Sequence, residues 1–343
     1  MTSFQRSSMT KSGLERDNSS RSFASSQIGY GLTFSRNWLI HIAQQTVSIA
    51  DEGKYLNKHG EEINISEALK YTLDNSKHYH SSHNFNPSKT TKSNFKHTTY
   101  CVCYGSSLEI AGRLQEQLLL SNEEFEIGIL NSASAKHPDK FFRGTLSQEE
   151  SICRACLLYP CLMKYYGLPH HFYSVNMKPK YYDSSSSCAI YSPRVPVIRE
   201  DSVQGKLLDD YKTYSIVSIP APNAFALGTG EEGLVPEAQA PGAGERKEDY
   251  GSMTVNSAMH DRVFRALSIF AEQGCTDLVL CAFGCGVHGN DPKHLAICFR
   301  EILSDELKGR FRTVAFAINP SRHKNFEEFA KVFENIGEGH DYP

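Results

Sequence analysis

From residue 98 onward, the sequence alternates short apolar runs with longer amphipathic segments. The runs are rich in β-branched and aromatic residues, as strands are, and the segments between them carry apolar residues at helical spacing. Strands separated by helices of this length favour a layered α/β fold, so the pattern predicts a mixed, largely parallel central sheet flanked by helices. The expected strands are 99–104, 126–130, 189–190, 214–219, 278–282 and 313–318, and the expected helices are 107–120, 148–166, 255–273, 292–307 and 325–332.

The residues before this region have a different composition. Residues 1–27 are rich in Ser, Thr, Asn, Arg and Gln, which predicts a disordered polar tail. Residues 28–97 are expected to form a helical extension, with helices at 36–56 and 66–74 and an exposed polar loop at 75–97. That loop contains His78, His80, His83 and His97, but no carboxylate or thiol stands at ligand spacing, so we expect no metal site there. The main domain is assigned to 98–340, with a flexible insertion rich in Gly, Pro, Ala and Glu at 228–252.

Charge and cysteine usage narrow the classes of function. The net charge is −3 and no basic stripe stands out, so nucleic-acid binding is not expected. No apolar run reaches the length of a membrane span, and the N-terminus lacks a hydrophobic signal core. Ten cysteines in 343 residues are not a disulfide framework, and the isolated Cys153-x-x-Cys156 is interpreted as ordinary thiols. We expect a reducing compartment, taken as the cytoplasm, with the nucleus or delivery to a host as alternatives.

A glycine-rich loop follows one of the expected strands. Residues 278–282 form a short apolar run, Gly284, Gly286 and Gly289 come next, and a helix is expected to begin at Asp291-Pro292. Glycines allow a backbone to approach a ligand closely, and a helix N-terminus favours an anion, so the loop predicts a phosphate or diphosphate site. It matches neither of the common phosphate-loop fingerprints, and a turn that merely closes a crossover is the alternative.

Two adjacent glutamates mark a second candidate site. A strand is expected to end at Asn131, and after a long loop a helix begins near Ser147 with Gln148, Glu149 and Glu150. One carboxyl of a close, partly buried pair keeps its proton and can serve as a general acid. The alternative is structural, because Ser147-x-x-Glu150 has the pattern of a capping box.

With these two motifs and several other ordered sequence blocks, the chain resembles the microbial-type poly(ADP-ribose) glycohydrolases, a family of enzymes with the macrodomain fold. The resemblance spans roughly residues 35–337. Its ordered blocks are 36–55, 107–111, 131–136, 147–155, 190–199, 220–223, 284–292 and 314–318.

The resemblance implies ADP-ribose as the ligand and hydrolysis of a ribosyl glycosidic bond as the reaction, with poly- or mono-ADP-ribosylated protein as the substrate. It implies that Glu150 protonates the leaving oxygen and that Glu149 orients the ribose hydroxyls. It also implies a reaction that requires no metal and no cofactor. The ligand-binding residues that the resemblance implies are Asn131, Gln148, Asn223, Gly284, Cys285, Gly286, Val287, His288, Gly289 and Asn290.

Two departures from the family pattern affect these expectations. Where the family has three glycines before its Gln-Glu-Glu element, this chain has residues 138–144 and keeps only Gly144. Asp139 brings an unfavourable charge toward a diphosphate, which Lys140 and Arg143 can offset. The second departure is His288, which stands where the family usually has Phe. The alternative functions are therefore a catalytically weakened reader of ADP-ribose and a scaffold for another nucleotide or a protein partner.

Overall fold

The computed structural model describes residues 35–85, 95–178, 186–226 and 255–333. The predicted tail at 1–27 and the predicted insertion at 228–252 lie outside these residues. Among the described helices, none combines the length and the apolar character needed to cross a bilayer.

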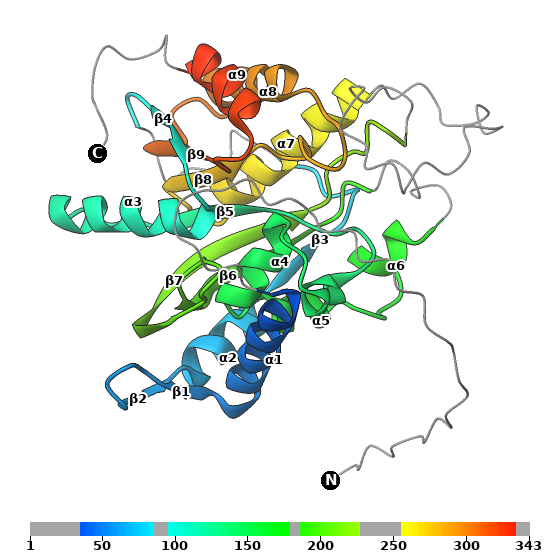
Figure 1. Cartoon of the computed structure of the whole chain (residues 1–343). Helices are drawn as coiled ribbons and strands as arrows, with labels where there is room; N and C mark the ends of the chain where they lie inside the picture. Colours follow the sequence, from blue (N-terminus) through cyan, green and yellow to red (C-terminus); the bar gives the residue numbers. More distant parts are fainter. Residues whose placement is uncertain (1–34, 86–94, 179–185, 227–254, 334–343) are drawn as a thin grey trace. The chain divides into compact units, whose positions relative to one another are not determined.

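A seven-stranded sheet forms the centre of the fold, in the order β3-β6-β7-β5-β8-β9-β4 (Figure 1). The four strand pairs from β7 through β5, β8 and β9 to β4 are parallel, whereas β3 and β6 are added antiparallel at the other edge. The predicted mixed and largely parallel sheet is confirmed. Its strands are β3 (Lys77–Tyr79), β4 (Thr99–Tyr104), β5 (Ile127–Ser132), β6 (Ala189–Arg199), β7 (Leu207–Ile219), β8 (Asp277–Cys281) and β9 (Thr313–Ile318).

Helices cover both faces of the sheet, because the central strands are apolar on both sides. In β8, Leu278 and Leu280 pack into one core while Val279 between them packs into the other. The first core lies under α7 (Val255–Glu272), α8 (Pro292–Ser304) and α9 (His323–Phe333). The second lies under α1 (Arg36–Glu52), α3 (Ser107–Ser121), α4 (Gln148–Ala155), α5 (Leu158–Met163) and α6 (Phe172–Asn176). A short hairpin, β1 (Lys54–Leu56) and β2 (Glu62–Asn64), and α2 (Ser66–Asn75) complete the elements near α1.

Two sequence predictions about the N-terminal half are wrong in detail. The predicted helix 148–166 is two helices, because Cys156 is extended and bridges to Val197 of β6. The polar loop expected at 75–97 contains β3, which pairs antiparallel with β6 and buries Tyr79. The segment before residue 98 therefore supplies an edge strand to the central sheet.

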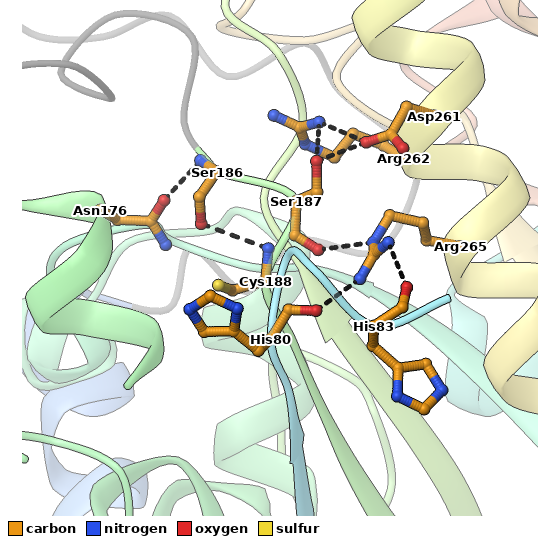
Figure 2. A network of polar contacts seen from close by, with 9 residues as sticks. All are labelled: His80, His83, Asn176, Ser186, Ser187, Cys188, Asp261, Arg262 and Arg265. Carbon is orange, nitrogen blue, oxygen red and sulfur yellow. Dashed lines mark hydrogen bonds and ion pairs between the residues drawn. The ribbon is translucent and has the colours of Figure 1, made fainter. Parts of the chain in front are cut away.

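Two arginines of α7 hold the start of β6 and the end of β3 in place (Figure 2). Arg265 donates to three backbone carbonyls, those of His80 at 2.7 Å, His83 at 3.1 Å and Ser187 at 2.9 Å. Arg262 donates to the Ser187 hydroxyl at 2.8 Å. Because one charged side chain bonds carbonyls of both segments, this partly buried network fixes the antiparallel edge of the sheet to the helical layer.

Arg265→Ala is expected to lower the free energy of unfolding by about 3 kcal/mol, because it removes the donor from three carbonyls at once. Denaturant unfolding measures the effect. Arg300→Ala, on the exposed side of α8, is the matched control and is expected to stay within about 0.5 kcal/mol of wild type. Equal stability of the two variants would contradict the conclusion that Arg265 holds the edge of the sheet to α7.

Candidate active site

The two sequence motifs meet at one edge of the sheet. β5 and β8 are parallel neighbours, so Asn131 near the end of β5 and the glycine loop that follows β8 emerge side by side. β7 is the parallel neighbour of β5 on its other side and leads into the turn that contains Asn223. The carboxyl edge of a parallel sheet is where ligands bind in α/β folds.

Glu149 is buried and held by two protein donors. Its Oε2 accepts a hydrogen bond from Asn131 Nδ2 at 3.1 Å, and its Oε1 accepts one from the Ser134 backbone N–H at 3.0 Å. Asn131 is itself fixed, since its Nδ2 also donates to the Ser218 hydroxyl of β7 at 2.9 Å. The orientation of Glu149 is therefore set by two strands and the loop after β5.

Glu150 is buried as well, at 3% exposure, but its surroundings differ. Within the described part of the chain, its Oε2 makes no hydrogen bond. The Ser147 side chain makes no capping bond, so the capping-box interpretation is wrong. A true capping box occurs at α3, between Ser106 and Glu109. Glu150 is thus a buried carboxyl with one oxygen that makes no hydrogen bond among the described residues, which is unusual for a buried polar atom.

Burial shifts the titration of both glutamates upward. Burial is the main cause that raises the pKa of Glu149 to about 8. The hydrogen bonds from Ser134 and Asn131 oppose this rise, and the nearby Glu150 charge adds to it. Burial also raises the pKa of Glu150, and the positive charges of Lys140 and Arg154 oppose that rise. The pair therefore retains a proton at neutral pH, as a general acid requires.

Gln148 braces the start of α4 and is occupied by protein partners. Its Oε1 accepts from the Ser132 backbone N–H at 2.9 Å, and its Nε2 donates to the Ser107 hydroxyl at 2.8 Å and the Leu130 carbonyl at 2.9 Å. These contacts tie α4 to β5 and α3, so they position the glutamates that follow Gln148.

The glycine loop is shaped by close packing at Gly284 and Gly289. Both have positive φ, +73° and +65°. A Cβ on Gly284 would lie 2.4 Å from the Asn290 Nδ2 atom, whereas a Cβ on Gly286 would meet nothing within 4 Å. Asn290 closes the loop, because its Nδ2 donates to the Gly284 and Pro222 carbonyls, each at 2.9 Å. Gly286 is left with the open approach that a phosphate needs.

The remaining predicted loop residues differ in exposure and in contacts. Cys285 is buried, whereas Val287 is 68% exposed. The His288 carbonyl accepts from the Ala224 N–H at 2.9 Å, which joins the loop to the turn after β7. Burial is the main cause that lowers the pKa of His288, so its imidazole is neutral at pH 7. Asn223 uses its Oδ1 to accept from the Ala226 N–H at 3.2 Å.

The segment that lacks the glycine triplet folds as a 3-10 helix, η2 (Pro138–Arg143), which the sequence analysis missed. Phe141 anchors it, with its ring 4.2 Å from that of Phe142 and 4.7 Å from that of Tyr159. Gly144 ends it with φ +65°, and a Cβ there would lie 2.7 Å from the Arg36 carbonyl. The segment is therefore a compact turn packed against α1.

A cavity of about 500 Å³ lies away from the glutamates, between α7 and α8 on the opposite face of the sheet. It meets the glycine loop only through Gly289, Asn290 and Asp291.

Cys153 and Cys156 are buried in the core under α4 and α5, where they pack as small apolar residues. Among the described residues, no group of three or more His, Cys, Asp or Glu side chains is arranged to hold a metal ion.

A comparison with solved structures finds proteins whose overall fold is similar to that of this chain. Poly(ADP-ribose) glycohydrolase from Thermomonospora curvata is 28% identical with a TM-score of 0.69, and the match covers 87% of this chain and 100% of that one. The same protein bound to the inhibitor ADP-HPD matches at 27% identity and a TM-score of 0.68, covering 86% of this chain and 99% of that one. Poly(ADP-ribose) glycohydrolase from Deinococcus radiodurans in complex with ADP-ribose is 28% identical with a TM-score of 0.60, covering 78% of this chain and 98% of that one.

A comparison with curated proteins finds no match. The family model described as "Microbial-type PARG, catalytic domain" matches residues 43–200, a stretch that contains Asn131, η2 and both glutamates of α4. Together with the structural matches over most of the chain, this match supports the microbial-type PARG family as the family that the chain resembles.

Proposed function

We propose that the protein is a glycohydrolase that cleaves the ribosyl glycosidic bond of poly- or mono-ADP-ribosylated substrates, with Glu150 as the general acid. The observation that carries the proposal is the buried Glu149–Glu150 pair. Glu149 is held by two donors, and one Glu150 oxygen has no hydrogen-bond partner in the part of the chain that the structure describes. A module that only binds ADP-ribose has no need for a paired, proton-retaining acid. The relatives solved with ADP-ribose and with ADP-HPD support the choice of ligand.

The chemistry follows from the positions of these groups. Backbone N–H groups around Gly286 bind the diphosphate, and Asn131 and Glu149 orient the ribose. Glu150 donates its proton to the leaving oxygen as the bond to the anomeric carbon breaks, and positive charge develops on the ribose ring. Water then adds its oxygen to the anomeric carbon and returns a proton to the glutamate pair. The products are ADP-ribose and the free hydroxyl of the leaving group.

A catalytically weakened reader of ADP-ribose is the second candidate. It is favoured by one observation, the replacement of the family's glycine triplet by the compact η2 turn. A turn that carries side chains leaves a ligand less room than the glycine backbone that the resemblance implies there.

We also propose a reducing compartment such as the cytoplasm. The ten free thiols, most of them buried, support this proposal.

The test is a comparison of two substrates, poly(ADP-ribose) and mono-ADP-ribosylated protein, with released ADP-ribose identified by its mass. Release from either substrate supports the hydrolase, and the faster one identifies the substrate class. If neither substrate releases ADP-ribose although calorimetry detects ADP-ribose binding, the hydrolase proposal fails and the reader remains.

Turnover is expected to fall as the pH rises through about 8, because the active form of the pair is the protonated one and burial holds the pKa of Glu149 at about 8. At lower pH the pair keeps its proton and the rate is expected to level off. The measurement is kcat/KM between about pH 6 and pH 10, with an enzyme-free blank at each point. A rate that stays flat or rises over this range would contradict general acid catalysis by this pair.

A further inference from the structure

Two of the ten cysteines differ from the rest in exposure. Cys101 and Cys103, both on β4, are half-buried, whereas the other eight are buried. β4 lies at the edge of the seven-stranded sheet, beyond β9 (Figure 1). Among the strands that the structure describes it pairs with β9 alone, so no further strand covers its outer side. The thiols that solvent reaches are therefore the two of one Cys-x-Cys pair.

These two thiols lie on the same face of the sheet. Side chains alternate along a strand, and Val102 packs against the core under α7, α8 and α9, whereas Cys101 and Cys103 pack against the core on the side of α3 and α4. Their partners in the parallel register with β9 are Ala315 and Ala317. Because alanine side chains are small, the neighbouring strand fills little of the space beside the two sulfur atoms.

The spacing of the pair favours a shared metal ion over a disulfide. Two residues of a strand rise by about 6.6 Å. That separation is near the upper limit of the Cα distance that a disulfide spans, about 4.4–6.8 Å, and the S–S bond of about 2 Å would bend the strand. An ion that binds two thiolates at a bond length of about 2.3 Å, as zinc does, lets the sulfur atoms stay up to about 4.6 Å apart. The pair can therefore share an ion while β4 stays extended.

The electrostatic surroundings favour a thiolate at this pair. Hydrogen bonding with Cys101 is the main cause that lowers the pKa of Cys103. Burial opposes this shift, and the positive charge of Arg113 on α3 adds to it. Since the thiolate is the form that binds a metal, one ligand of the pair is already prepared. The charge of Arg113 also offsets the negative charge that two thiolates keep around a monovalent ion.

The number and kind of ligands select the ion. Thiolates are soft ligands, so they favour Cu⁺ and zinc over the hard ions Mg²⁺ and Ca²⁺, which bind oxygen. A structural zinc site takes four protein ligands. In the part of the chain that the structure describes, no set of three or more His, Cys, Asp or Glu side chains is arranged to hold a metal. Two thiolates alone suit Cu⁺, which forms linear complexes with two sulfur ligands.

We propose that Cys101 and Cys103 form a two-coordinate site for a soft monovalent metal ion of the Cu⁺ type on the edge strand β4. Two S–H bonds break, two S–Cu bonds form, and two protons pass to solvent. The copper stays Cu⁺, so no electron is transferred. Neither cysteine belongs to the glutamate motif or to the glycine loop, and the inference does not rest on the proposed function.

The test titrates Cu⁺ into the full chain without oxygen, with the thiols kept reduced by a phosphine and with bicinchoninate as the competing chelator. Wild type is expected to retain one ion per chain. Cys101→Ser and Cys103→Ser are each expected to lower the affinity by more than about 10²-fold, beyond the loss that a change outside the ligand set causes. Cys298→Ser, which removes a buried thiol of α8, is the matched control and is expected to keep the wild-type affinity.

X-ray absorption of the wild-type complex tests the site without any substitution. Two sulfur neighbours around copper are expected, and a first shell of nitrogen or oxygen, or of more than two sulfur atoms, would overturn the inference. It also fails if wild type yields its ion to the chelator, if either β4 variant keeps the ion, or if Cys298→Ser loses it. Thermal unfolding shows that each variant is folded. ADP-ribose release is measured separately, so a wild type that retains Cu⁺ but releases no ADP-ribose would contradict the proposed function and leave this inference standing.

Discussion

Glu150→Gln is expected to lower kcat for ADP-ribose release by about 10²-fold or more, with the Kd for ADP-ribose within a few-fold of wild type. The carboxamide has nearly the same shape as the carboxyl group but has no acidic proton for the leaving oxygen. Because Glu150 Oε2 makes no hydrogen bond among the described residues, the substitution breaks no such contact there. Initial rates at saturating substrate and calorimetric titration of ADP-ribose into the same samples measure the two quantities.

Glu67→Gln is the matched control for this substitution. Glu67 also lies in the first turn of a helix, α2, but is exposed and distant in the chain from both motifs. If Glu150 served only as a negative charge in the first turn of α4, both variants would keep full activity. Each would lose at most about 1 kcal/mol of stability. Equal kcat values for Glu67→Gln and Glu150→Gln would remove Glu150 from the mechanism.

Gly286→Ala is expected to weaken ADP-ribose binding by about 10- to 100-fold without loss of stability. No atom lies within 4 Å of the position that its Cβ would take, so the free protein accommodates the methyl group. A diphosphate bound to the loop backbone would instead meet that methyl group and lose a charged hydrogen bond worth about 1.5–3 kcal/mol. Calorimetry and thermal unfolding on the same protein separate binding from stability.

Gly284→Ala is the companion variant and is expected to lose both ADP-ribose affinity and stability. Its φ is +73°, and its Cβ would lie 2.7 Å from the Ala221 Cβ as well as against Asn290. The loop must therefore shift, which lowers the unfolding temperature together with affinity. Unchanged ADP-ribose affinity in Gly286→Ala would mean that the ligand does not bind along this loop.

The sequence predicted the parallel part of the sheet well because those strands are short and apolar on both faces. The runs at 278–282 and 313–318 became β8 and β9 almost residue for residue. β6 and β7 extend well beyond the predicted 189–190 and 214–219, because Pro196 and the pair Asp209–Asp210 interrupt the apolar pattern that a strand prediction follows. The break at Cys156 was missed for the opposite reason, since apolar residues continue on both sides of it.

For the candidate site, the sequence identified the residues better than their roles. It located the glutamate pair and the glycine loop, and the structure places both at one edge of the sheet. The spacing of Ser147 and Glu150 also predicted a capping box as the alternative, and the structure shows none there. Spacing could not decide this, because cap geometry depends on the side-chain rotamer. The contact from the Ser134 N–H to Glu149 was not predicted, since any residue type can supply a backbone donor. The catalytic and ligand-binding roles themselves stay predictions.

The contacts of the turn at 138–143 show the same limit. The Arg143 carbonyl accepts a hydrogen bond from the Arg36 guanidinium of α1. Such contacts join residues far apart in the chain, so they are not visible in the spacing of residues.

The most direct test of the account is a single-turnover assay with enzyme in excess over an ADP-ribosylated substrate, run for wild type and Glu150→Gln. Excess enzyme removes product release and weak binding from the observed rate, so the assay reports bond cleavage alone. The account predicts that wild type releases all of the bound ADP-ribose in one phase and that Glu150→Gln does so at least about 10²-fold more slowly. A wild type that binds the substrate fully and releases no ADP-ribose would contradict the central claim.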